Sequence, residues 1–185
     1  QAHVIVCANP RRIYATIAQQ LYPQAIASGQ VHPTAQIDET ASIDPTAEIG
    51  AFCVIGKGVH VGAQTILGPS VYIGDFVSIG TGCLLASGVK VSHTSIGDQV
   101  QIAENTVIGK RGFGFEGIGK NATIIPHIGS VKIGNNVDIG ALCTIDRGVN
   151  AQTIIEDYAM LDNLVHLAHN VFIGEGSILC AQCAI

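Results

Sequence analysis

Two histidines in the segment NLVHLAHNVFIG, residues 163–174, are the side chains of this chain best suited to chemistry. His166 and His169 lie three residues apart among residues that are mostly aliphatic or small. An imidazole, with an unperturbed pKa of about 6.5, can take up and release a proton near neutrality. Either histidine could therefore serve as a general base, and the elements around the pair must decide which one faces a substrate.

Those elements are units of six residues. Aliphatic side chains recur at every sixth position, as at Ile37, Ile43, Ile49 and Ile55, and a glycine often follows this aliphatic anchor. A period of six matches neither a single helix nor one face of a strand, but it fits a short strand followed by a corner. Three units close a triangular coil, and coils stack about 4.8 Å apart. The sequence therefore predicts an all-β parallel β-helix over residues 31–185, in which each coil contacts only its neighbours.

The register of the repeat separates the two histidines. Leu161 and Leu167 are anchors, so His166, one position before an anchor, points outward from a flat face. His169 comes two positions after Leu167 and falls at a corner. Corners are where a trimer of triangular prisms could leave a groove between subunits, so His169 is the better placed of the two.

The repeat does not cover residues 1–30. An apolar, strand-like run at residues 3–7 precedes the segment NPRRIYATIAQQLYP, which is typical of a helix. Asn9 is suited to the N-cap and Pro10 to the first turn, while Ile13, Ile17 and Leu21 share one face.

A second interruption is predicted at residues 109–131, a glycine-rich loop excursion that contains the motif GFGF. Phe113 and Phe115 lie in this loop, although the whole chain has only five phenylalanines. A solenoid corner does not need two aromatic rings, and long loops of this kind are more often functional than neutral. We therefore expect both phenylalanines to contact a substrate, the alternative being a flap over the hydrophobic wall.

Composition excludes several classes of protein. Hydrophobic residues make up 48% of the chain and charged residues 12%, the opposite of a disordered protein. With a net charge of −5 and no basic cluster, nucleic acid is not an expected partner. No apolar run approaches the roughly 20 residues that a membrane span requires, so we expect no transmembrane segment.

The six cysteines do not suggest a disulfide framework or a metal site. Cys53, Cys83, Cys143 and Cys183 all fall at the small, inward-pointing position before an anchor, so we predict reduced thiols that fill the core. Cys180 and Cys183 form a C-x-x-C motif without a second pair, so no metal is expected there.

The motifs GFGF, IPHIG, TIDRG and DNLVHLAHNVFIG together resemble the UDP-3-O-acylglucosamine N-acyltransferases, hexapeptide-repeat enzymes of lipid A biosynthesis. The resemblance runs across nearly the whole chain and implies a left-handed β-helix, although physics alone favours right-handed crossovers. It also implies that residues 1–30 are the tail and linker of a small uridine-binding α/β domain. Because the chain begins without Met and stops in mid-pattern, we expect it to be incomplete at both ends.

The resemblance implies transfer of a 3-hydroxyacyl chain from acyl carrier protein to the 2-amino group of a UDP-3-O-acylglucosamine. The expected assembly is a cytoplasmic homotrimer. No cofactor is implied, because the phosphopantetheine arm of acyl carrier protein delivers the acyl chain as a substrate. In the family the histidine of the AHN motif is the general base, and it corresponds to His169. We add Asn163, His166 and Asn170 as expected substrate contacts.

Two carboxylates are candidates for orienting His169, and the sequence does not choose between them. Asp162 is also found in the family, seven residues before the histidine, but it falls at the preceding corner, about 15–20 Å away along one face. It could reach His169 only from a neighbouring subunit. Asp146 would lie one coil below Ala168 if residues 149–154 hold a four-residue insertion, and could then fix the ring tautomer. The oxyanion donor is expected one coil above His169, near position 187.

Three other functions compete with this prediction. A zinc enzyme of the γ-class carbonic anhydrase type needs three histidines that meet across subunits, and His93 and His127 fall in no matching register. An ice-binding solenoid would present ladders of Thr-x-Thr, which the sequence lacks. A different sugar-nucleotide acyltransferase, acting on oxygen or using acetyl-CoA, would share the fold. The O-acyltransferase relatives typically have HRG where this chain has Asp146-Arg147-Gly148, and they lack the GFGF loop.

Overall fold

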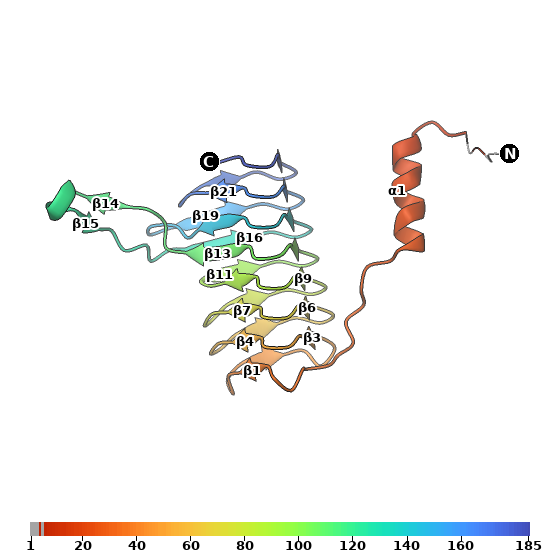
Figure 1. Ribbon diagram of the computed structural model, residues 1–185, viewed down its shortest axis with the longest axis horizontal. Helices are drawn as coiled ribbons and strands as arrows, with labels where there is room; N and C mark the ends of the chain where they lie inside the picture. Colours follow the sequence, from red (N-terminus) through yellow and green to blue (C-terminus); the bar gives the residue numbers. More distant parts are fainter. Residues whose placement is uncertain (1–3, 5) are drawn as a thin grey trace.

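A three-sided stack of short parallel strands forms the body of the molecule (Figure 1). The computed structural model describes residue 4 and residues 6–185. Each complete coil contributes one strand to each of three seven-stranded sheets. The predicted left-handed parallel β-helix is confirmed.

The strands of each sheet follow one another along the stack. The first sheet contains, in spatial order, β1 (Gln36–Ile37), β4 (Val54–Ile55), β7 (Tyr72–Ile73), β10 (Lys90–Val91), β13 (Val107–Lys110), β18 (Thr144–Asp146) and β21 (His166–Leu167). The second contains β2 (Ser42–Ile43), β5 (His60–Val61), β8 (Ser78–Ile79), β11 (Thr94–Ile96), β16 (Ser130–Ile133), β19 (Gln152–Ile155) and β22 (Phe172–Ile173). The third contains β3 (Glu48–Ile49), β6 (Ile66–Leu67), β9 (Leu84–Leu85), β12 (Gln101–Ile102), β17 (Asp138–Ile139), β20 (Met160–Leu161) and β23 (Ile178–Leu179).

The register stacks the anchors of successive coils directly on one another. Ile37 pairs with Ile55 and Ile55 with Ile73, so that equivalent positions differ by 18 residues. Within a strand the anchor is buried and its predecessor faces outward: Ile55 is 2% exposed and Val54 is 38% exposed. Burying one such aliphatic side chain stabilises the fold by about 1.5–3 kcal/mol. The interior column of anchors is therefore the main stabilising feature.

The corners are fixed by hydrogen bonds from the coil below. Several place a residue other than glycine at positive φ, including Phe52 at 59° and Asn170 at 64°. Thr34 Oγ1 accepts a hydrogen bond from the Phe52 backbone N–H at 3.0 Å, and Thr153 Oγ1 accepts one from that of Asn170 at 2.9 Å. These bonds offset the cost of the left-handed conformation and hold each corner residue in place.

The cysteines behave as core residues. Cys53, Cys83 and Cys143 are free and at most 1% exposed, as predicted, while Cys183 is half-buried against the core. Burial raises the pKa of the Cys53, Cys83 and Cys143 thiols, so these side chains stay neutral at physiological pH. Cys180 is exposed.

Helix α1 (Pro10–Leu21) forms where the sequence predicts it, and Asn9 Oδ1 caps it by accepting a hydrogen bond from the Arg12 N–H at 3.1 Å. It stands apart from the stack and buries none of its residues (Figure 1). Of the apolar run at residues 3–7, positions 3 and 5 lie outside the described residues, and the other positions form no strand. No helix among the residues described here is long and apolar enough to cross a membrane.

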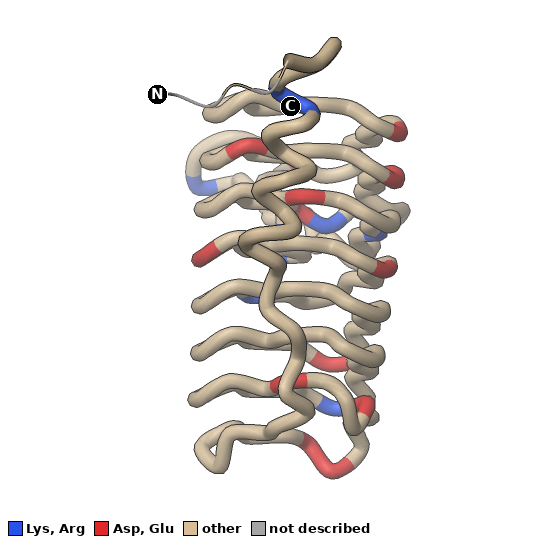
Figure 2. Tube along the Cα trace, turned by 90° about the vertical axis from the view of Figure 1, so that its right-hand side faces the viewer, with Lys and Arg blue, Asp and Glu red and all other residues tan. Residues whose placement is uncertain are grey.

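The loop excursion is shorter and more ordered than predicted. Because β13 continues to Lys110 and β16 begins at Ser130, it spans residues 111–129 rather than 109–131. It forms an antiparallel hairpin of β14 (Phe115–Glu116) and β15 (Thr123–Ile124), joined through the short 3₁₀-helix η1 (Gly119–Asn121). The hairpin projects sideways from the corner between the first and second sheets (Figure 1). The rest of the stack keeps a regular outline, with charged positions scattered over its corners (Figure 2).

Candidate active site

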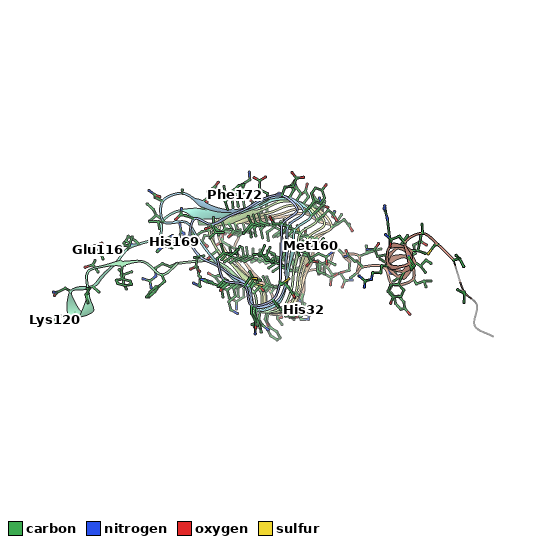
Figure 3. All side chains as sticks on the ribbon, turned by 90° about the horizontal axis from the view of Figure 1, so that it is seen from above. His32, Glu116, Lys120, Met160, His169 and Phe172 are labelled. Atoms are coloured by element: carbon green, nitrogen blue, oxygen red, sulfur yellow. The ribbon has the colours of Figure 1, made fainter. Side chains whose placement is uncertain are left out.

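His169 lies at the corner between β21 and β22, as the register predicts. Seen from above, this corner is the one from which the hairpin projects (Figure 3). The backbone that carries the ring is pinned by the bond from Asn170 N–H to Thr153 Oγ1, a hydroxyl that is fully buried. The ring is half-buried, so its position is fixed while one side remains open to a substrate.

The side chain of Asn170 determines which nitrogen of His169 carries the proton. Asn170 Oδ1 lies 3.0 Å from His169 Nδ1 and also accepts a hydrogen bond from the Val149 backbone N–H at 3.0 Å. An atom that accepts from a backbone N–H is an oxygen, so His169 Nδ1 must be the donor in the first contact. Nε2 of the neutral ring is then unprotonated and can accept a proton, as a general base requires.

A second histidine, His127, lies directly against His169. The ring centroids are 4.8 Å apart, with 58° between the ring planes. His127 is 5% exposed, and neither of its ring nitrogens has a hydrogen-bond partner among the described residues. This contact could not be predicted from the sequence, because the solenoid register stops inside the excursion. The signal that could have pointed to it is the histidine of the IPHIG motif, just before the chain rejoins the repeat.

Asp146 completes the cluster from the coil below. The pairing of Ile145 with Leu167 puts Asp146 one coil below Ala168, as the four-residue insertion predicts. Its carboxylate is 2% exposed and forms an ion pair with Lys110, a residue that the sequence analysis did not single out. The hydrogen bond of the His169 ring goes to Asn170, and none joins the ring to Asp146 among the described residues, so a catalytic role for Asp146 stays a prediction.

Gly112, in the chain just before GFGF, shows how closely these groups converge. A Cβ atom added there would lie 3.1 Å from His127 Nε2, 3.2 Å from Asp146 Oδ2 and 3.2 Å from His169 Cδ2. The excursion thus brings its backbone over the two histidines and the carboxylate, so closely that a side chain on this residue would require its neighbours to shift by a few tenths of an ångström.

The other predicted site residues lie around the coil rather than at this cluster. Asp162 follows β20 in the third sheet and accepts a hydrogen bond from the Asn163 backbone N–H at 2.7 Å. Asn163 Oδ1 accepts one from the Ala141 N–H at 2.8 Å. The first residue of β21, His166, points outward, and its Nδ1 lies 2.8 Å from Thr144 Oγ1. A role for Asp162 from a neighbouring subunit, and substrate contacts by Asn163, His166 and Asn170, stay predictions.

Phe113 and Phe115 pack edge to face at the stem of the hairpin. Their ring centroids are 5.4 Å apart, and the side chains are 81% and 50% exposed. The pair therefore does not form a flap over the hydrophobic wall of its own chain. An exposed apolar pair beside a cluster of polar groups is suited to hold an acyl or sugar group, which stays a prediction.

A groove of about 460 Å³ adjoins the cluster on the side of the second sheet. Its lining includes Ser78, His93, Gly129, Arg147 and Gln152. Arg147 Nε donates a hydrogen bond to the Gly129 carbonyl at 2.6 Å and so ties the end of the excursion to the coil. Burial and the charge of Arg147 lower the pKa of His93, which favours a neutral ring there. Within the described residues no group of three or more His, Cys, Asp or Glu side chains could hold a metal ion.

Two curated relatives share this chain almost from end to end. The UDP-3-O-acylglucosamine N-acyltransferases 2 of Legionella pneumophila strains Paris and Philadelphia 1 are 48% and 52% identical to it over 183 residues. In each case 99% of this chain and 53% of the relative are covered. Over nearly its whole length the chain is therefore similar to UDP-3-O-acylglucosamine N-acyltransferases. It spans about half the length of the curated relatives it matches.

Two further likenesses concern the fold. The crystal structure of UDP-N-acetylglucosamine O-acyltransferase from Moraxella catarrhalis RH4 superposes with a TM-score of 0.70 at 26% identity, covering 83% of this chain and 59% of that one. A family model described as the GMPPB C-terminal domain matches residues 26–111, the solenoid coils that precede the excursion. The family model ends at residue 111 and so does not include His127, Asp146 or His169.

Proposed function

We propose that this protein transfers a 3-hydroxyacyl chain from acyl carrier protein to the 2-amino group of a UDP-3-O-acylglucosamine, with His169 as the general base. The observation that carries this proposal is the contact of His169 Nδ1 with Asn170 Oδ1, an oxygen that also accepts from the Val149 N–H; it assigns the ring proton to Nδ1 and leaves Nε2 able to accept one. Relatives named for this reaction, about half identical to the chain, support the choice of substrates.

The reaction needs one positioned base. The amine of the sugar attacks the thioester carbonyl carbon and gives up a proton, which His169 Nε2 takes. The C–N bond forms, the C–S bond breaks, and the thiolate of the phosphopantetheine arm leaves and is protonated by the imidazolium. A positioned base of this kind is typically worth about 10²–10⁴-fold in rate. No cofactor enters this scheme.

The proposal includes a homotrimer. His169 lies at a corner that is open on one side, and the described residues wall it with the excursion and the coil itself. Several corners of the stack expose large apolar side chains, among them Phe52, Phe76 and Tyr158, at 65%, 72% and 54%. Surfaces of this kind are suited to contact between copies. A neighbouring subunit would close the site, and its Asp162 could then approach His169.

An acylation assay with the full-length protein tests the reaction. The donors are 3-hydroxyacyl carrier proteins of graded chain length, and the acceptor is UDP-3-O-acylglucosamine. We expect an amide product, with one chain length preferred. The cytoplasm is the compartment in which we place this reaction. Faster acylation of UDP-N-acetylglucosamine on oxygen, or transfer from acetyl-CoA alone, would contradict the proposal and favour the other sugar-nucleotide acyltransferases.

A further inference from the structure

His127 is a buried imidazole whose ring nitrogens form no hydrogen bond with the residues described here. The side chain is 5% exposed, and both Nδ1 and Nε2 lack a hydrogen-bond partner among the described residues. A neutral imidazole has one donor and one acceptor, and burying them without partners costs free energy. Phenylalanine would fill the same space without that cost. Packing therefore explains the presence of a ring at this position but not the presence of its nitrogens.

The surroundings of His127 point to where the missing partner lies. Its ring contacts that of His169 at 4.8 Å, and its Nε2 faces the point beside Gly112 that Asp146 Oδ2 and His169 Cδ2 also approach. On its other side Gly114 covers the ring so closely that an added Cβ would lie 3.0 Å from His127 Cε1. The loop backbone covers this side, and neither ring nitrogen is exposed in this structure. A partner therefore has to approach where the ring borders His169 and displace a neighbouring group to reach a nitrogen.

We propose that His127 is a substrate-contacting residue, in which one ring nitrogen forms a hydrogen bond with a polar group of the sugar nucleotide, next to the amine that His169 deprotonates. This inference rests on the proposed function. A hydroxyl or carbonyl oxygen on the sugar would be the hydrogen-bond partner that the ring lacks among the described residues. Part of the free energy lost by leaving the nitrogens unpaired in the empty site is then recovered when the UDP-sugar binds.

Two substitutions in the full-length protein separate the ring from its nitrogens. His127→Phe keeps a planar ring and removes both nitrogens, whereas His127→Gln loses the ring and keeps a donor and an acceptor. His60→Phe, on the outward face of the second sheet, is the matched control. The readouts are melting temperature, kcat/KM for the UDP-sugar, and calorimetric binding of the UDP-sugar without an acyl donor.

We expect His127→Phe to melt at the same temperature as the parent or higher, while kcat/KM and binding of the UDP-sugar both fall about tenfold, the loss expected for one hydrogen bond. His127→Gln should melt lower yet retain more binding than His127→Phe. His60→Phe should change neither activity nor binding. If His127→Phe binds and turns over like the parent, the proposal is wrong, and losses that simply follow melting temperature would show a packing role. A parent that binds the UDP-sugar but transfers no acyl group would overturn the proposed function and leave the binding test of His127 standing.

Discussion

At the scale of single residues, the position of one proton on His169 decides what the site can do. The neighbouring Asn170 selects the tautomer, because its Oδ1 accepts from both a backbone N–H and the ring. Asparagine also tolerates the left-handed backbone that this corner needs, with φ at 64°. Asn170 thus both adopts the left-handed backbone of the corner and accepts the hydrogen bond of His169 Nδ1.

The substitution Asn170→Gly tests this role. Glycine keeps the left-handed corner but removes the acceptor for Nδ1, so the ring is free to rotate and to change tautomer. We expect kcat to fall by about one to two orders of magnitude. This loss is smaller than that expected for removing the base, which is typically worth about 10²–10⁴-fold in rate. Asn170→Asp restores an acceptor and should recover most of the rate. The control is Asn105→Gly, at another corner with φ of 59°, which should leave kcat unchanged. Equal rates for Asn170→Gly and the parent would refute the role of Asn170.

At the scale of elements, the excursion matters because it lowers its backbone onto the two histidines. Gly112 is the point of closest approach, with the side chains of His127, Asp146 and His169 all within 3.2 Å of an added Cβ. Such contacts are closer than ordinary van der Waals distances, so a methyl group there has to displace the loop or the rings.

We expect Gly112→Ala to lower kcat by up to about tenfold, because the methyl group requires shifts of a few tenths of an ångström at the histidines and a displacement of about 1 Å can cost about 100-fold in rate. The melting temperature should change little, because the solenoid core is not involved. Gly119→Ala is a control in the same excursion, where an added Cβ would meet nothing within 4 Å, although its φ of 56° adds backbone strain. Steady-state kinetics and a thermal melt of both variants make the comparison. If both glycines tolerate alanine equally well, the loop does not press on the site.

The contrast between the solenoid and the excursion explains what could be predicted from the sequence. A period of six repeats its anchors so often that the register of Leu161, Leu167 and His169 follows from counting. The same count locates Asp146 below Ala168 once the insertion is recognised. Between Lys110 and Ser130 the period is lost, and no local pattern tells where the ring of His127 will lie. The hydrogen bond from His169 to Asn170 also depends on side-chain conformations that a spacing rule does not contain.

The corners of the stack carry a pH dependence of their own. At Asp157, hydrogen bonds from the backbone N–H and the side chain of Asn135, at 2.7 Å and 3.2 Å, hold the carboxyl pKa below its usual value. A carboxylate with a depressed folded-state pKa contributes stability above its unfolded pKa of about 3.9 and loses it as the pH falls through the folded value.

We therefore expect Asp157→Asn to flatten the decline of melting temperature as the pH falls below about 4. The control Asp138→Asn changes an exposed carboxylate for which no side-chain hydrogen bond is found among the described residues, and its melting curve should keep the slope of the parent. Thermal melts at stepped pH provide the measurement. If melting temperature declined as steeply in Asp157→Asn as in the parent, the hydrogen bonds between Asn135 and Asp157 would not contribute to acid sensitivity.

At the scale of the whole molecule, the triangular prism leaves the corner that carries His169 open, and we propose that a neighbouring subunit closes it. The expected trimer is tested by sedimentation of the full-length protein together with assays at decreasing enzyme concentration. Activity per chain should fall when dilution dissociates the trimer, because each site then loses a wall. A monomer that remains fully active would contradict the trimer and with it any contribution of Asp162 from a neighbouring subunit.

The central claim is that His169, and not His166, is the general base, and the rates of the two alanine variants test it most directly. In the full-length protein, His169→Ala should lower kcat by about 10²–10⁴-fold. Its melting temperature and UDP-sugar binding should stay close to those of the parent, because the corner side chain fills no core. His166→Ala, which removes an outward-facing ring from the sheet, should mainly raise KM, as the loss of a uniform binding contact does. Near-normal turnover in His169→Ala together with loss of turnover in His166→Ala would contradict the account.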